Sequence, residues 1–330
     1  MTDITVPLVD VHAHFVTDHY VELAKAAGFE RPDGMPGWPT WSVEGQLALM
    51  SEARIQKSML SISSPGVHWG DDAAARSLAR EVNNFGAAVR SEYPERFGHW
   101  ASLPLPDVEG SLAELAYALD DLGSDGVALE TNMDGRYLGD PGFEPLWNEL
   151  DRRSAVVLVH PTSPHIPESV SLGRPRPMLE FIFDSARTVA DLVFAGVLER
   201  HPNIRWLFTH GGGALPLLAD RMELFRTTFA SGAPSAASVQ EQIGALWFDM
   251  AGTPFPNQIP ALVRAFGQER LVYGSDSCWT PAAAVLAQVA SIDSARQPAG
   301  ESWRSLTTRN AGVLLSDRTP SVDRRGRLAA

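Results

Sequence analysis

Near the N-terminus the chain reads Val9-Asp10-Val11-His12-Ala13-His14-Phe15, and this stretch decides the fold. A short apolar run here ends in two histidines that are one residue apart. Alternate side chains of a β-strand point to the same face, so His12 and His14 would lie side by side. Two imidazoles at the end of a buried strand supply half of a metal site, although one core and one solvated histidine would give the same pattern. The remaining ligands must come from elsewhere in the chain.

Short apolar segments alternate with longer helical segments along the rest of the sequence. This alternation is typical of βα units and of a parallel sheet. Eight units over roughly 270 residues match the size of a (β/α)8 TIM barrel, whereas a doubly wound sheet, the competing architecture, more usually has six strands. We therefore predict a barrel with strands at 7–15, 56–64, 97–105, 126–132, 155–161, 204–212, 245–252 and 271–277.

Apolar residues that recur at a period near 3.6 predict the helices between these strands. We expect one barrel domain over 1–330, with loops 28–42 and 162–177 above the active site and a C-terminal helix and tail over 303–330. The helices are expected at 43–53, 73–92, 111–122, 143–153, 178–200, 214–229, 258–266, 281–292 and 304–315.

Polar residues end several of the predicted strands. His160 ends the fifth, His210 ends the sixth and Asp276 ends the eighth. Catalytic residues of such barrels come from several strand ends at one face, so these side chains should meet His12 and His14. Three imidazoles and a carboxylate suit one divalent ion, Zn²⁺ first and Mn²⁺ as the alternative.

We assign the metal to His12, His14, His160 and Asp276, and a catalytic acid or base role to His210 together with Asp276. The fourth strand carries no lysine that could bridge two ions once modified, and Lys25 and Lys57 are the only lysines of the chain. Glu130 could bridge two ions, but it is more simply a polar residue at a strand end. One metal is the better interpretation.

The net charge of −13 argues against nucleic acid or an anionic membrane as a partner, because both bind basic surfaces. The one cysteine, Cys278, cannot form an intramolecular disulfide. No stretch reads as a signal peptide or as a membrane span of ~20 residues. These features predict a cytoplasmic protein that acts on a small molecule.

The motifs at the strand ends resemble those of a known family. H-x-H at 12–14, His160-Pro161, Thr209-His210-Gly211-Gly212-Gly213 and Gly274-Ser275-Asp276 are similar to the amidohydrolase superfamily. They look most like the branch that contains aminocarboxymuconate-semialdehyde decarboxylase, γ-resorcylate decarboxylase and 6-methylsalicylate decarboxylase. Two departures from the family motifs argue against two of these substrates. Gly213 stands where resorcylate-type members carry a glutamate, and 34–40 lacks the arginine of the carboxymuconate-semialdehyde enzyme. The resemblance is strongest to the 6-methylsalicylate type.

The resemblance implies a metal-dependent, non-oxidative decarboxylase of a small ortho-hydroxybenzoate, without an organic cofactor, and a homodimer. Hydrolysis of a lactone or an amide on the same scaffold is the alternative. For the substrate ring we name Phe15, Trp41, Met178 and Phe183, each of which could instead serve ordinary packing. Arg187 could pair with the substrate carboxylate or with Asp184, and roles for His165 and Cys278 stay open.

Overall fold

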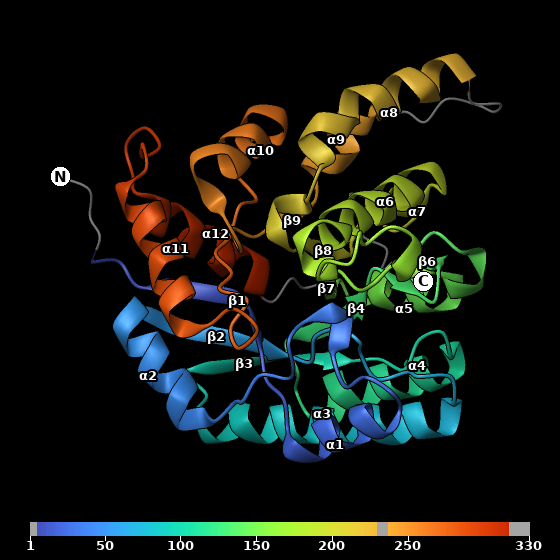
Figure 1. The fold of residues 1–330 in the computed structure, drawn as a ribbon. Helices are drawn as coiled ribbons and strands as arrows, with labels where there is room; N and C mark the ends of the chain where they lie inside the picture. The colour runs from blue at the N-terminus through green and yellow to red at the C-terminus, as the bar shows by residue number, and fades with distance from the viewer. Residues whose placement is uncertain (1–4, 230–236, 317–330) are drawn as a thin grey trace, which may run out of the picture.

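The computed structural model describes residues 5–229 and 237–316. Seven parallel strands form one curved sheet in the order β1-β2-β3-β4-β7-β8-β9, and helices surround it (Figure 1). The predicted barrel is confirmed by this arrangement. The strands of the sheet are β1 (Leu8–His14), β2 (Ile55–Ser61), β3 (Phe97–Ser102), β4 (Gly126–Glu130), β7 (Val156–His160), β8 (Arg205–Phe208) and β9 (Trp247–Phe248).

The eighth predicted strand, 271–277, closes the barrel without forming a continuous ladder. Isolated parallel bridges join Tyr273 to Asp10 and Leu271 to Phe248, so the segment touches both outer strands of the sheet. Asp276 has a φ of +59°, which is left-handed backbone that interrupts extended pairing. The position of the segment is therefore as predicted, and its regular strand structure is not.

Most predicted helices are present with ends shifted by a few residues. The stretch 178–200 is the exception: it breaks at Gly196, whose φ of +72° ends one helix before the next begins. A hairpin of β5 (Asn132–Met133) and β6 (Arg136–Tyr137) was not predicted. The helices are α1 (Asp18–Ala26), α2 (Val43–Ala53), α3 (Asp72–Glu92), α4 (Val108–Ala116), α5 (Glu144–Arg152), α6 (Glu180–Phe194), α7 (Val197–Arg200), α8 (Leu215–Phe229), α9 (Val239–Gly244), α10 (Ile259–Phe266), α11 (Ala282–Ser294) and α12 (Trp303–Leu315).

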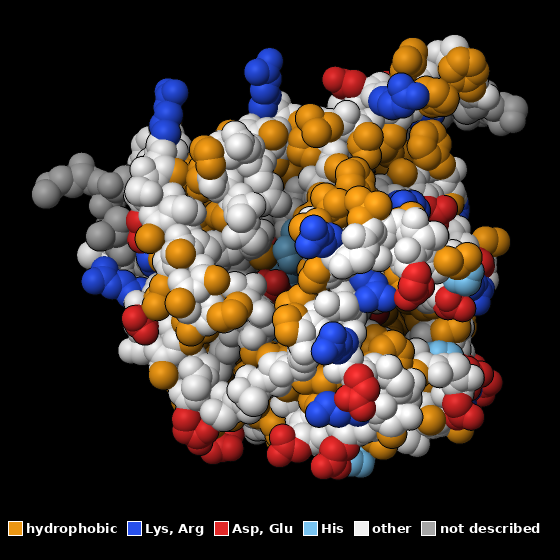
Figure 2. Space-filling model, in the orientation of Figure 1, with side chains coloured by type: hydrophobic (Ala, Val, Ile, Leu, Met, Phe, Trp, Pro, Cys, Tyr) orange, Lys and Arg blue, Asp and Glu red, His pale blue; other side chains and the backbone are white. Residues whose placement is uncertain are grey.

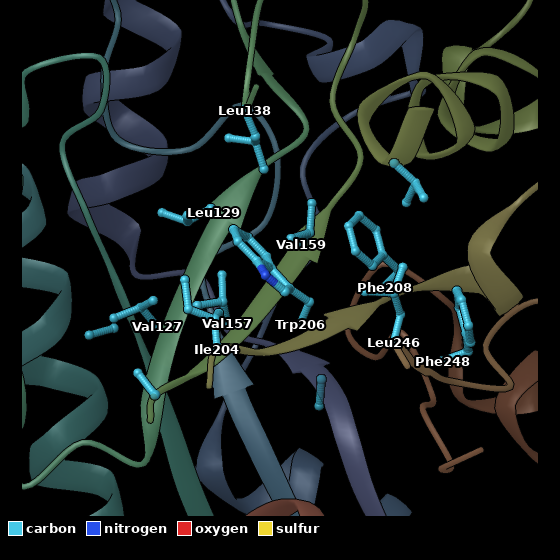
Figure 3. Packing of buried hydrophobic residues seen from close by; sticks show 14 of the residues in the cluster. Val127, Leu129, Leu138, Val157, Val159, Ile204, Trp206, Phe208, Leu246 and Phe248 are labelled. Atoms are coloured by element: carbon cyan, nitrogen blue, oxygen red, sulfur yellow. The ribbon is translucent and has the colours of Figure 1, made fainter. Parts of the chain in front are cut away.

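Alternate residues of the strands divide the core into two clusters. On β7, Val157 and Val159 belong to the larger cluster, and Figure 3 shows them with Trp206 and Phe208 of the neighbouring strand. Leu158 belongs to the smaller cluster, whose members come from nearly every strand of the barrel. This alternation sends the last residue of β7, His160, to the same side as Leu158.

Helix α12 closes the end of the barrel at which the strands begin. Its Ala311 and Leu314 belong to the smaller cluster, and the Arg205 guanidinium at the start of β8 donates to the Leu314 carbonyl oxygen. The opposite end, where the strands finish, stays available for the polar residues. The predicted tail beyond α12, at 317–330, lies outside the described residues. No helix in the described ranges combines the length and apolar character that a membrane crossing needs.

Candidate metal centre

The four predicted ligands come together at the ends of three elements. His12 and His14 end β1, His160 is the last residue of β7, and Asp276 lies in the segment that closes the barrel. One potential ligand atom from each of the four lies within 4.8 Å of all the others. The three histidines are buried, and the Asp276 side chain is 18% exposed. Residues separated by more than 250 positions thus form one site.

Hydrogen bonds fix the ring orientation of the two histidines on β1. His12 Nδ1 lies 2.8 Å from Asp249 Oδ2, and His14 Nδ1 lies 3.0 Å from Ser61 Oγ. With the Nδ1 proton held by these oxygens, the Nε2 lone pairs remain free for a metal. The two Nε2 atoms are 2.9 Å apart and lie 3.5 Å (His12) and 3.4 Å (His14) from Asp276 Oδ1.

His160 carries an unpartnered nitrogen. Its Nδ1 is buried and has no hydrogen-bond partner among the described residues, while its Nε2 lies 3.5 Å from Ser63 Oγ. Buried ring nitrogens almost always have a hydrogen-bond or metal partner, so we expect this nitrogen to have one as well. The Glu130 Oε2 atom lies 3.7 Å from this nitrogen. A divalent cation among the four side chains would relieve the close approach of the His12 and His14 nitrogens. The residues therefore fit a bound metal ion, with imidazole and carboxylate donors that suit zinc or manganese.

Electrostatics keep most of this donor set in the form that binds metal. Burial lowers the pKa of His14 to about 4 and that of His160 well below its usual value, so both rings are neutral at pH 7. Burial opposes charge on Asp276, but hydrogen bonds with His14 and His210 outweigh it and hold its pKa well below the ordinary value. Burial likewise opposes charge on His12, yet the Asp249 carboxylate raises its pKa.

His210 lies beside the ligand set rather than in it. Its Nε2 is 3.6 Å from Asp276 Oδ2, and its backbone N–H donates to Asp249 Oδ1 at 2.8 Å. Gly213, three residues after His210, can only be a glycine. Its φ is +63°, and a Cβ there would collide with the Ile182 carbonyl oxygen. A glutamate at this position would not fit, which gives a physical reason for the departure noted in the sequence.

A cavity of about 170 Å³ opens above these residues. Phe181 and Trp279 supply its aromatic walls, and Asp33 and Met35 come from the first of the two loops predicted to cover the site. Pro177 comes from the second loop. The other residues that line the cavity are Ser63, Ser64, His160, His210, Asp276 and Thr280.

Comparison with known proteins agrees with this geometry. The model of the amidohydrolase family matches residues 9–306. The chain belongs to the amidohydrolase family. It is 35% identical to decarboxylase yanB of Aspergillus niger over 84% of this chain and 78% of that protein, and 36% identical to 6-methylsalicylic acid decarboxylase acuB of Aspergillus aculeatus over 81% and 83%. A solved structure described as an amidohydrolase II is 32% identical, with a TM-score of 0.88 over 93% of this chain and 99% of that one.

The structure places none of the five predicted substrate residues along the cavity of this amidohydrolase. Phe15 is buried behind β1, where its ring packs against Trp41 and Phe85 at centroid distances of 5.9 and 5.3 Å. Met178 and Phe183 are 54% and 48% exposed. Phe15 and Trp41 thus pack as the alternative for them had it, and the aromatic side chains that line the cavity are those of Phe181 and Trp279.

The remaining predicted residues have local partners. Arg187 Nη1 lies 2.7 Å from Asp184 Oδ1, which is the second of its two predicted partners. His165 Nδ1 lies 2.8 Å from Asp134 Oδ1. Burial raises the pKa of the Cys278 thiol to about 12. None of the three lines the cavity above the ligands.

Sequence reasoning missed Asp249, the residue that links His12 to His210. The residue lay inside the seventh predicted strand, 245–252, whereas the observed strand β9 ends at Phe248, so Asp249 directly follows it like the other polar residues at strand ends. Glu130 ends β4, and its Oε2 lies 3.7 Å from His160 Nδ1, outside the group of four ligands. Phe181 and Trp279 carried no signal, since an aromatic residue in a loop or a helix start is common.

Proposed function

We propose that the chain is a metal-dependent, non-oxidative decarboxylase of a small ortho-hydroxybenzoate of the 6-methylsalicylate kind. One observation carries the proposal: a three-histidine, one-aspartate cluster with a non-ligand histidine beside it, in a chain of the amidohydrolase family. The curated relatives named above support it, because both are decarboxylases. The reaction makes the enzyme a carboxy-lyase.

A metal held by His12, His14, His160 and Asp276 would neutralise the substrate carboxylate and the neighbouring phenolate. The chain's own residues do the rest. Phe181 and Trp279 form the aromatic walls of the cavity and exclude water from the substrate ring. Positioning of the ring between them fixes the reacting carbon relative to the acid group.

The proton comes from the pair of His210 and Asp276. Both side chains line the cavity, and their Nε2 and Oδ2 atoms are 3.6 Å apart. Transfer of this proton to the ring carbon that bears the carboxylate removes the need for a free aryl carbanion. The bond to the carboxylate carbon then breaks, its electron pair returns to the ring, and CO2 and the phenol leave. General acid catalysis of this kind contributes typically a factor of 10²–10⁴.

Incubation of the metal-loaded protein with 6-methylsalicylate tests the proposal. We expect CO2 and the corresponding phenol in equal amounts, and a rate at least about 100-fold lower with His210→Asn, which keeps the ligand set intact. Related ortho-hydroxybenzoates should react as well, whereas a benzoate without the ortho hydroxyl should not. Hydrolysis of lactones or amides without turnover of any of the acids would contradict the proposal and favour the hydrolase alternative.

We further propose one zinc ion per chain, with manganese as the alternative. Three neutral imidazoles and one carboxylate are a usual zinc set, and Mn²⁺ accepts the same donors with lower affinity. Elemental analysis should give one divalent ion per chain, and a chelator-treated sample should regain activity with Zn²⁺ or Mn²⁺. Two ions per chain would contradict the proposal and would point to Glu130 as a bridging ligand.

A cytoplasmic location stays a prediction from the sequence.

We also propose that the chain forms a homodimer. Hydrophobic side chains gather over α6 and α8 on one face of the molecule (Figure 2). Contiguous exposed apolar surface of this kind marks interaction sites. The exposed members include Phe183, Phe194, Leu217, Leu224, Phe225 and Phe229.

A double substitution on α8 tests this surface. Leu224→Glu with Phe225→Glu should convert a dimer into a monomer in light scattering after gel filtration. Val313→Glu is the matched control, because Val313 is similarly exposed (45%) but lies on α12. A wild-type monomer at micromolar concentration would contradict the dimer.

A further inference from the structure

A second and larger cavity lies beside the metal centre. Its volume is about 740 Å³, within the usual range for small-molecule sites and well above the 170 Å³ over the ligands. Asp33 lines both cavities. Ser64 lines the smaller one and the next residue, Pro65, lines the larger one, and the same change of side occurs between Arg176 and Pro177. The two spaces therefore share a border.

The border consists of short polar side chains. Ser64 Oγ and Thr162 Oγ1 lie 2.7 Å apart, and Ser163 Oγ donates to Asp33 Oδ1. Glu130 belongs to the larger cavity, yet its Oε2 is only 3.7 Å from His160 Nδ1 of the metal centre. A group bound at the metal would thus have the larger cavity next to it.

Three side chains that line the larger cavity carry a buried polar atom without a partner. These atoms are Trp69 Nε1, Glu130 Oε2 and Arg176 Nε, and none has a hydrogen-bond partner among the described residues. Such atoms are rare in folded proteins, and three at one cavity indicate that something else satisfies them.

The chemistry of the lining indicates what would bind. The indole and guanidinium N–H groups are donors only, so they require acceptor oxygens on the ligand. The rest of the wall combines apolar side chains, such as Phe29, Val67 and Leu103, with polar and charged ones, such as Arg31, Asn132 and Asp134. An apolar body that bears oxygen atoms satisfies both features.

We propose that this cavity receives a second, oxygen-bearing ring or side chain of an ortho-hydroxyaryl carboxylic acid whose carboxylate lies in the metal centre. The proposal rests on the decarboxylase function given above and extends its substrate class to larger ortho-hydroxyaryl acids. The preferred substrate is then larger than a single methyl-substituted ring, and 6-methylsalicylate would use only the smaller cavity.

Matched naphthoates test the proposal. We would measure kcat/KM for 3,5- and 3,7-dihydroxy-2-naphthoate against 3-hydroxy-2-naphthoate, which lacks the distal hydroxyl. The wild type should prefer at least one dihydroxy compound. Trp69→Phe removes the indole N–H and keeps a ring, and Arg176→Lys removes Nε–H and keeps the charge. Each should reduce that preference about five- to ten-fold, as expected for one lost hydrogen bond, and leave turnover of 6-methylsalicylate unchanged.

Trp147→Phe is the matched control, because Trp147 Nε1 is likewise buried without a partner among the described residues but lines neither cavity. It should leave the preference as it is. A wild type that rejects all three naphthoates, or variants that keep the preference, would overturn the inference while turnover of 6-methylsalicylate still upheld the decarboxylase. If no acid is turned over, the decarboxylase fails, and calorimetric binding of the same naphthoates to the metal-loaded variants still decides the inference.

Discussion

Asp249→Asn should weaken metal binding through the protonation state of His12. Asp249 Oδ1 accepts hydrogen bonds from the backbone N–H groups of His210 (2.8 Å) and Ala251 (2.9 Å), and its Oδ2 lies 2.8 Å from His12 Nδ1. An asparagine can keep the first two bonds with its carbonyl oxygen. Its NH2 group, however, stands where Oδ2 accepted the His12 proton, and it can only donate.

The expected consequence is a change of tautomer. His12 Nδ1 must then accept from the amide, so the ring proton moves to Nε2, the atom that faces His14 and Asp276. A protonated Nε2 cannot bind a metal. If the proton instead stays on Nδ1, the Nδ1–H group faces the NH2 group of the asparagine, and two donors oppose each other. Loss of such an orienting partner typically costs 10–100-fold in metal affinity, which corresponds to about 1.4–2.7 kcal/mol.

Competition with a chromophoric zinc chelator at fixed pH measures this change directly. Asp10→Asn is the control, because Asp10 is also a fully buried aspartate near His12 but its contacts are with backbone N–H and serine hydroxyl groups. The control should bind zinc within about three-fold of the wild type, since no ring nitrogen loses its partner. Unchanged zinc affinity in Asp249→Asn, with a normal thermal transition, would refute the reasoning.

Three further outcomes are expected. His210→Asn should keep one metal per chain by elemental analysis but lower kcat by at least about 100-fold, because it removes the acid group and no ligand; an equal loss of metal would show that His210 is a ligand. Phe181→Ala should raise KM by about ten-fold through lost ring contact, whereas Phe183→Ala, which changes an exposed side chain, should leave it unaltered; the reverse order would contradict the cavity assignment. Cys278 should react slowly with iodoacetamide at pH 8, since its pKa of about 12 leaves the thiol protonated and only the thiolate is nucleophilic, and its labelling should accelerate as the pH rises; rapid labelling of the native protein at pH 8, followed by mass spectrometry, would show that the thiol pKa is not raised.

The sequence alone was sufficient to predict the four candidate metal ligands that the structure brings together. His12 and His14 share a face because side chains alternate along a strand, and His160 and Asp276 follow apolar runs that end at the same rim of a barrel. These are consequences of short-range geometry and of one topological rule. The pattern of apolar segments was sufficient to predict the barrel for the same reason.

Only the tertiary structure decided which side chains line the cavity above the candidate ligands. Phe15 follows His14 directly, but side-chain alternation along the strand turns its ring into the larger core cluster, where Trp41 and Phe85 cover it. Phe181 and Trp279 reach the cavity because a loop and a helix start converge above the metal centre, and such convergence depends on contacts between residues far apart in the chain. The cavity beyond Asp33 has the same origin, since five separate segments (28–33, 62–70, 102–106, 128–134 and 162–176) enclose it and no local pattern in any of them specifies the space between.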